Sequence, residues 1–251
     1  MRKIGVFLAV LSLPLLALPL AAQEGGGNVA KVVCDKIQPG KSTQFEEGWK
    51  KHGDWHRKQN DPWTWLAWQV ITGPDSGTYC AGSFGHNWED FDNPRFPADA
   101  DLADVAATFG PFVREHEFTF WTALPNVSNP SEGQPAMSSV IFFHTRYGTE
   151  ENFNHLIGEF HKAIEKTNMP WNYEWYALVS GGNVGTYALV LPRPNFAAFN
   201  PTGKPFPKML EEAYGKAGAD ALLAKWRKVV KSANSELSRS RPDLGYIPAG
   251  Q

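Results

Sequence analysis

The hydrophobic pattern is clearest between residues 153 and 164. Apolar side chains recur there at positions i, i+3, i+4, i+7 and i+11, namely Phe153, Leu156, Ile157, Phe160 and Ile164. A stripe at this spacing is typical of an α-helix that buries one face. The stretch from Asn168 to Pro170 ends the pattern, because proline is not accommodated inside a helix. We therefore predict a helix that packs against other structure through one apolar face.

Short runs of β-branched and aromatic residues predict the strands, and glycine-rich turns follow each run. Two of the runs carry aromatic residues on both faces, which indicates burial on both sides, since a strand with one wet face alternates apolar and polar residues. The runs are Lys31 to Ile37, Trp63 to Ile71, Ser139 to Thr145 and Trp171 to Val179, and further strands begin at Thr78 and Thr186.

The same order of elements occurs twice, at an offset of 108 residues. The segment from Phe45 to Phe91 corresponds to Phe153 to Phe199 without a gap, and the Gly-Thr-Tyr sequence of the first copy returns in the second. A fixed internal period indicates a duplicated unit. We therefore divide the chain into a first repeat at 29–128, a linker at 129–138 and a second repeat at 139–246.

Each repeat is predicted to end in a second helix and a fourth strand. Gly110 and Pro111 interrupt the helical pattern of the first repeat, and the second repeat has an extra helical turn at 208–214. The offset between the copies rises to 117 here, so the second repeat carries about nine extra residues. The predicted helices are Leu102 to His116 and Leu222 to Ala233, and the predicted strands are Phe118 to Ser128 and Glu236 to Gly245.

The order strand, helix, strand, strand, helix, strand is that of a ferredoxin-like unit. Two such units in tandem, each with a sheet face that needs cover, favour packing sheet to sheet within the chain. With the duplication and the closing sequence RPDLGY at 241–246, the chain resembles the dimeric α+β barrel superfamily, in the group that includes NIPSNAP-like and antibiotic-biosynthesis-monooxygenase-like domains. We expect an α+β fold in which two tandem βαββαβ units form an intrachain pseudo-dimeric barrel.

The resemblance covers roughly residues 29 to 246 and implies helices outside the barrel, with a pocket between the sheet and its helices. Some members of the superfamily degrade haem or oxidise aromatic substrates, and others have no known activity. The sequence itself contains no phosphate-binding loop, no GxGxxG after a strand, no GxSxG and no CxxC. No motif therefore identifies a reaction.

Residues 1–22 have the order of a secretory signal peptide, with Arg2 and Lys3, an apolar run from Ile4 to Leu20, and two alanines. A membrane anchor is the alternative, but the run contains two prolines and is short for a span. No later stretch is apolar enough to cross a bilayer. There is also no cysteine near Ala22, which argues against a lipid anchor. We expect an exported protein, periplasmic or extracellular.

Charge and cysteines refine this expectation. Cleavage after Ala22 removes two of the 24 basic residues and none of the 26 acidic ones, so the net charge changes from −2 to −4 and does not suggest a nucleic-acid partner. Cys34 and Cys80 are the two cysteines, and an exported chain meets oxidising conditions. They form either one disulfide or two buried thiols, since their counterparts, Phe142 and Ala188, are apolar.

Comparison of the two copies identifies a candidate site on the first predicted helix, Phe45 to Gln59. His52 and His56 stand where the second copy has Phe160 and Ile164. Two imidazoles four residues apart share one helical face, so they can ligate a metal ion, provide a haem ligand or transfer protons. The same face has lost volume through its glycines, Gly48 and Gly53, which is expected to open a hollow against the sheet.

A structural role for the two histidines remains the alternative. The pair lacks the glutamate of the HExxH pattern, and no third ligand lies at motif spacing, although His116, Asp35 and Glu117 could approach in three dimensions. His144 is a further pocket candidate. In a structural role, His52 and His56 would be hydrogen-bonded groups in the core or at an interface.

Tryptophans suggest a second kind of contact, because their flat apolar rings can stack on sugars or aromatic ligands. Trp63 and Trp171 occupy equivalent positions, which favours core packing, whereas Trp49 and Trp55 have no aromatic counterpart. The predicted ligand-binding residues are Trp49, His52, His56, Trp68 and His116, with His52 and His56 also predicted as metal ligands.

Two functions remain open on this basis. One is an exported barrel without catalytic activity that binds a small apolar or aromatic ligand, or a partner, in a pocket of the first repeat. The other is a monooxygenase-like oxidoreductase that uses His52 or His56 with haem or a divalent metal, or acts without a cofactor. The sequence fixes neither the ligand nor the oligomeric state.

Overall fold

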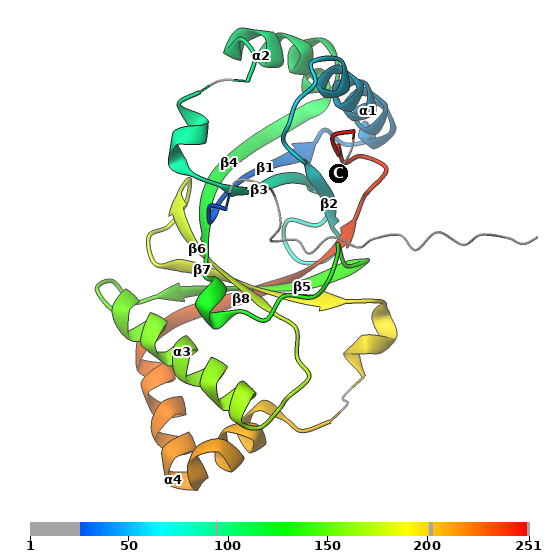
Figure 1. The fold of residues 1–251 in the computed structure, drawn as a ribbon. Helices are drawn as coiled ribbons and strands as arrows, with labels where there is room; N and C mark the ends of the chain where they lie inside the picture. The colour runs from blue at the N-terminus through cyan, green and yellow to red at the C-terminus, as the bar shows by residue number, and fades with distance from the viewer. Residues whose placement is uncertain (1–25, 94, 201–202, 250–251) are drawn as a thin grey trace, which may run out of the picture.

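The computed structural model describes residues 26–93, 95–200 and 203–249 (Figure 1). The predicted signal peptide, residues 1–22, lies outside them. Within the described residues the chain forms eight strands, four α-helices and four short 3₁₀ helices. None of these helices is long and apolar enough to cross a membrane.

The elements follow one another in the predicted order. The strands are β1 (Val29–Ile37), β2 (Leu66–Val70), β3 (Tyr79–His86), β4 (Val113–Ala123), β5 (Met137–Thr145), β6 (Glu174–Ser180), β7 (Thr186–Arg193) and β8 (Val230–Ser240). The α-helices are α1 (Ser42–Lys58), α2 (Ala98–Ala107), α3 (Glu150–Lys166) and α4 (Phe206–Val229). The 3₁₀ helices are Trp88–Phe91, Gly110–Phe112, Pro125–Val127 and Phe196–Phe199.

The eight strands form one closed antiparallel barrel in the order β1-β3-β2-β8-β5-β7-β6-β4. Each repeat contributes four neighbouring strands. Figure 1 shows the ring of strands with α1 and α2 outside it on one side and α3 and α4 outside it on the opposite side. The predicted fold class, two ferredoxin-like units that form a pseudo-dimeric α+β barrel, is confirmed.

Two seams join the repeats. At one seam β2 pairs with β8, with Trp68 opposite Ser240, and at the other β6 pairs with β4, with Trp121 opposite Leu178. The repeat maps β2 onto β6 and β4 onto β8, so the seams are equivalent. Closure gives every strand two neighbours and leaves no exposed sheet edge, which an open sheet would have to protect.

Strand alternation separates the inside of the barrel from the helix-covered outside. In the first repeat, Ala67 and Ala81 face outward and pack with Phe45 of α1. In the second repeat a larger apolar core, which includes Phe153, Leu156, Met209 and Leu210, joins α3 and α4 to the sheet. The predicted apolar stripe of α3 is part of this core.

The predicted ends of the second helices are wrong in both repeats. In the first, α2 ends at Ala107 and a 3₁₀ turn carries Gly110 and Pro111, so Val113 and His116 belong to β4. Their spacing matched a helix by coincidence. Pairing with β1 holds this segment extended, with Ile37 opposite Val113.

The second repeat shows the same difference. Ala233, predicted as helical, lies in β8, which starts at Val230 and therefore before the predicted Glu236. The extra turn at 208–214 is the first part of α4. This helix is kinked at Gly215, whose φ of 70° lies in the left-handed region that glycine tolerates.

Cys34 and Cys80 form a disulfide in the structure. They lie directly opposite each other on β1 and β3, with a Cα–Cα distance of 4.1 Å. Their counterparts Phe142 and Ala188 are likewise paired on β5 and β7. The disulfide therefore takes the place of an apolar cross-strand pair of the second repeat and links residues 46 positions apart.

We expect the double substitution Cys34→Ala/Cys80→Ala to lower the free energy of unfolding by about 2–4 kcal/mol, because the cross-link restricts the unfolded chain. Urea unfolding of the oxidised protein, the reduced protein and the variant measures the difference. Reduced protein should unfold like the variant. Equal midpoints for the oxidised protein and the variant would contradict a stabilising disulfide.

Candidate functional site

A cavity of about 620 Å³ lies inside the barrel and is lined by strands of both repeats. We refer to this cavity as the lumen. Pockets for small molecules commonly measure about 300–1,000 Å³, so its volume suits a small ligand. The prediction of a pocket within the first repeat was wrong in this respect, since the second repeat forms half of the wall.

The hollow expected between α1 and the sheet is filled. The rings of Phe45 and Trp49 pack there with Tyr79 and Phe109. A Cβ at Gly48 would come within 2.7 Å of the Thr108 carbonyl oxygen. Gly48 therefore permits a close approach of the chain that follows α2, whereas a Cβ at Gly53 would have no neighbour within 4 Å.

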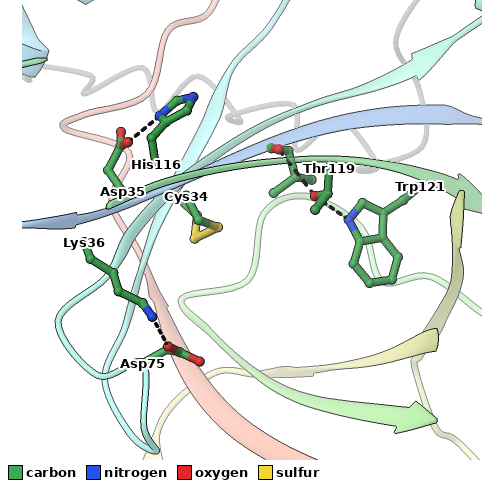
Figure 2. Close-up of a disulfide and its surroundings, with 9 residues drawn as sticks. Cys34, Asp35, Lys36, Asp75, His116, Thr119 and Trp121 are labelled. Atoms are coloured by element: carbon green, nitrogen blue, oxygen red, sulfur yellow. Dashed lines mark hydrogen bonds and ion pairs between the residues drawn. A yellow bond between two sulfur atoms is a disulfide. The ribbon is translucent and has the colours of Figure 1, made fainter. Parts of the chain in front are cut away.

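The lumen wall includes five large aromatic side chains. Aromatic rings suit apolar or aromatic ligands, because they offer large rigid surfaces with few rotatable bonds. The Cys34–Cys80 disulfide lies on the same wall, and Trp121 donates a hydrogen bond from its indole nitrogen to Thr119 Oγ1 at 2.8 Å (Figure 2). The aromatic residues of the wall are Trp68, Phe84, Trp121, Phe142 and Tyr176.

Carboxyl groups are the main charged groups of the lumen. Lys36 forms ion pairs with Asp75 at 2.8 Å and with Glu115 at 3.2 Å. The carboxyl groups of Glu117 and Glu236 have no ion pair or hydrogen bond with any described residue. The lumen-lining carboxyl residues are Asp75, Glu115, Glu117, Glu174 and Glu236.

Glu236 is the most strongly perturbed of these groups. Burial, together with the negative charges of Asp75 and Glu117, raises the pKa of Glu236 to about 7. Burial also raises the pKa of Glu174, although the hydroxyl of Tyr176 donates a hydrogen bond to it at 2.7 Å. The lumen therefore holds an acid that changes its protonation state near neutral pH.

The two predicted residues Trp68 and His116 lie on strands of the barrel, but their side chains face opposite sides of the sheet. Trp68 lines the lumen. His116 lies at its edge, but its ring turns to the opposite face of the sheet, where Nδ1 is 2.7 Å from the buried Asp35 carboxylate. Figure 2 shows this pair on one side of the strands and Lys36 on the other. The hydrogen bond with Asp35 raises the pKa of His116 against the effect of burial.

The other predicted residues, Trp49, His52 and His56, lie on α1 outside the barrel. Trp49 is part of the core between α1 and the sheet. The two histidines are buried and belong to a polar group on the outer side of the first repeat. The five predicted ligand-binding residues are thus divided between two places.

The α1 histidine cluster consists of His52, His56, Asp61, Asp101 and Asp104. His52 Nδ1 lies 2.8 Å from Asp104 Oδ2, and His56 Nδ1 lies 2.8 Å from Asp61 Oδ2. The two Nε2 atoms face each other at 3.1 Å. Asp101 Oδ1 lies 3.4 Å from His52 Nε2 and accepts no hydrogen bond from the described residues, although this oxygen is buried.

Packing around the cluster fixes the two rings. Trp55 stacks on His52 with an angle of 6° between the ring planes, and Phe96 contacts His56 edge to face. Burial lowers the pKa of His52, against the hydrogen bond with Asp104. These contacts leave the imidazoles little freedom to turn.

Asp61 anchors the far end of the cluster. It is fully buried and accepts hydrogen bonds from Arg95, from the Trp63 backbone N–H and from the Trp65 indole, in addition to the contact with His56. Burial opposes its ionisation, but the hydrogen bonds from His56 and Arg95 lower the pKa of Asp61. Asp61 is therefore a carboxylate that can only accept hydrogen bonds.

The residues present do not fit a haem. The cluster is closed by aromatic side chains, and each Nε2 faces another polar atom instead of open space. In the lumen, both ring nitrogens of His144 are hydrogen-bonded, to Thr186 and Asn234. The carboxyl-rich wall would also repel haem propionates. A single metal ion is a different case, because His52, His56 and Asp101 place one ligand atom each within 4.8 Å of one another.

Asp61, Asp101 and Asp104 were not among the site residues predicted from the sequence. The repeat offered a signal for Asp61, since its counterpart in the second copy is Met169, an apolar residue. Asp101 and Asp104 share one face of α2 at i, i+3 spacing. Their approach to α1, however, depends on how α2 docks.

Comparison with known proteins identifies the fold. No family model and no curated protein sequence matches the chain. Among solved structures, a "putative monooxygenase from Lactobacillus acidophilus NCFM" aligns with a TM-score of 0.54 and 9% identity, over 88% of this chain and 97% of that one. A mutant chlorite dismutase from Candidatus Nitrospira defluvii aligns with a TM-score of 0.54 and 9% identity, over 87% and 94%.

An "anthrone oxidase-like protein" gives a similar result, with a TM-score of 0.53 and 10% identity over 86% of this chain and 92% of that one. These neighbours have the dimeric α+β barrel fold. The chain therefore shares the fold of this superfamily over almost all of its described length. Sequence identities near 10% establish a shared fold but do not establish a shared activity.

We expect Glu236→Gln to change how stability depends on pH. The folded protein keeps the Glu236 proton up to about pH 7, whereas a free glutamate loses it near pH 4.5. The free energy of unfolding therefore falls as pH rises from 4.5 to about 7, because the unfolded chain releases this proton more readily than the folded protein does. The variant should lack this loss and gain stability relative to the wild type above pH 7.

Urea unfolding at pH values from 4 to 8 tests this expectation. The exposed Glu47→Gln is the control, because it removes the same charge outside the lumen. Parallel stability curves for wild type and Glu236→Gln would contradict a buried acid in the lumen.

Proposed function

We propose that this protein binds a small amphipathic molecule in the lumen, with an apolar or aromatic body and one basic group that meets Glu236. The observation that carries the proposal is a closed barrel with a cavity of about 620 Å³ whose wall combines aromatic rings with an unpartnered carboxyl group. This makes the first of the two expected functions more specific. It also extends the site over both repeats.

The apolar part of the ligand is suggested by the wall. Trp121 and Phe142 lie near each other across the β4 and β5 sides of the barrel, with ring centroids 6.2 Å apart, and Phe84 contacts Tyr176. Burial of apolar surface contributes about 25 cal/mol per Å². A body of drug-like size would therefore gain most of its binding free energy from these rings.

The basic part is suggested by charge. The lumen has five carboxyl residues and one lysine, Lys36. The ammonium group of Lys36 already forms ion pairs with Asp75 and Glu115. An ammonium group beside Glu236 would replace the proton that burial keeps on the carboxyl group. Hydrogen bonds with charged partners contribute about 1.5–3 kcal/mol, which is enough to select an amine over a neutral analogue.

Export is part of the proposal. The predicted signal peptide supports it, and a disulfide in the lumen wall is the kind of cross-link that oxidising compartments maintain. The ligand would then be a molecule found outside the cytoplasm.

An oxidoreductase remains the second candidate, and a specific feature of the lumen favours it. A half-buried carboxyl group of the lumen with a pKa of about 7 can act as a general base toward a bound phenol. The neighbours described as monooxygenase and oxidase proteins agree with this direction. Oxygen uptake with phenolic compounds, lost in Glu236→Gln, would support this candidate. His52 and His56 do not line the lumen, so it does not use them.

Calorimetric titration with octylamine, octanol and octanoate tests the binding proposal, because the three probes share a tail and differ in the head group. We expect octylamine to bind about tenfold more tightly than octanol, and octanoate to bind most weakly. Glu236→Gln should remove the preference for the amine without weakening octanol.

A lumen-filling variant provides the control for location. Val190→Trp places an indole in the lumen and should abolish binding of all three probes, whereas Val184→Trp, in an exposed turn, should leave it unchanged. Circular dichroism verifies that both variants fold. Equal binding by the two variants, or octanoate binding as tightly as octylamine, would overturn the proposal.

A further inference from the structure

We infer that the α1 histidine cluster is a binding site for one divalent transition-metal ion of the Zn²⁺ type, with His52 Nε2, His56 Nε2 and Asp101 Oδ1 as ligands. This site is separate from the lumen. The lumen lies inside the barrel, whereas the cluster lies among α1, α2 and the segment that follows α1. The inference therefore does not depend on the proposed ligand.

Hydrogen bonding defines the state of both imidazoles. The carboxylate of Asp61 accepts from Arg95, Trp63 and Trp65, so its contact with His56 Nδ1 requires that this nitrogen donates. The Asp104 carboxylate likewise accepts from His52 Nδ1. A neutral histidine carries one N–H. Both Nε2 atoms are then bare acceptors.

Three potential ligand atoms consequently lie within 4.8 Å of one another. The Nε2 atoms of His52 and His56 face each other at 3.1 Å, and Asp101 Oδ1 stands 3.4 Å from His52 Nε2 without accepting a hydrogen bond. Acceptors this close repel one another unless a cation lies between them. A proton shared by the two nitrogens would leave the buried Asp101 Oδ1 without a partner, whereas one metal ion can contact all three atoms.

The distances suit a metal ion. Ligand atoms about 2.0–2.1 Å from a tetrahedral zinc ion are about 3.3 Å apart. The observed separations of 3.1 Å and 3.4 Å lie on either side of that value. Small movements of three side chains would complete the coordination, and a water molecule or another ligand would take the fourth position.

The outer contacts are those that metal sites use. A ligating histidine usually donates its other N–H to a carboxylate, which fixes the tautomer and makes the ligand more basic. Asp104 does this for His52 and Asp61 does it for His56. Two nitrogen ligands favour zinc-like ions over Mg²⁺ and Ca²⁺, which prefer oxygen.

Charge agrees with a divalent cation. Arg95 pairs with Asp61, whereas the ion-pair partner that the described residues provide for Asp101 and Asp104 is His52. With both histidines neutral, these two carboxylates have no cationic ion-pair partner among the described residues, and Lys31 interacts with Asp101 only at longer range. One divalent ion would balance them.

The second repeat shows that the fold does not need this cluster. His52, His56 and Asp61 correspond to Phe160, Ile164 and Met169, which pack in an apolar core. Phe160 contacts Phe206 and Trp226 by its ring. The same position on the same scaffold is therefore satisfied by hydrocarbon, so the polar set of the first repeat has a separate purpose.

Metal binding by chelator-treated protein tests the inference. We expect calorimetry to give one Zn²⁺ per chain, and Co²⁺ to give the intense visible bands of a tetrahedral site with nitrogen ligands. Asp101→Asn should weaken Zn²⁺ binding by at least about tenfold, and Asp99→Asn should not. Asp99 is an exposed aspartate of the same helix, so it controls for the loss of charge.

A second variant keeps the test independent of Asp101. His52→Phe/His56→Ile installs the residues of the second repeat and should abolish the Co²⁺ bands, with its circular dichroism reporting whether it folds. The inference is overturned if the wild type binds neither ion with one-to-one stoichiometry, or if Asp101→Asn and Asp99→Asn bind Zn²⁺ equally tightly.

Discussion

Closure of the barrel through two equivalent seams is the constraint on which the rest of the molecule depends. Either repeat alone would expose β2 and β4, or β6 and β8, as sheet edges with unpaired backbone groups. Pairing of β2 with β8 and of β6 with β4 satisfies both edges at once. The duplication thus supplies within one chain what two subunits would otherwise have to provide.

Closure also creates two separate chemical environments. Alternate residues of every strand face either the lumen or the helices, so neighbouring positions in the sequence serve different purposes. On β1, Cys34 and Lys36 belong to the lumen, whereas Asp35 between them pairs with His116 on the outer face. The lumen requires both repeats. The α1 histidine cluster takes its histidines and carboxylates from the first repeat, and Tyr246 of the second repeat stacks on His56 and donates a hydrogen bond to the Asp61 carbonyl oxygen.

The sequence predicted the architecture because repetition and periodicity are local signals. The stripe of α3 and the paired positions of the two copies were sufficient for the order of elements and the barrel. The ends of α2 and α4 were not predictable, since Val113 and Val230 suit a strand or a helix and only pairing with β1 or β5 decides between them.

The candidate site was predicted in part for a similar reason. His52 and His56 differ from their counterparts, and that difference is visible in one sequence. Asp101 approaches them only because α2 docks on α1, and Glu236 is perturbed only because the barrel closes around it. Residues that come together only through tertiary structure cannot be recognised from their spacing in the sequence.

The account is tested most directly by a crystal structure of the protein with octylamine. We predict electron density for the alkyl chain in the lumen beside Trp121 and Tyr176, with the ammonium group within hydrogen-bond distance of Glu236. A lumen closed by collapsed side chains, with the amine bound elsewhere on the molecule, would contradict the central claim that the barrel interior is the binding site.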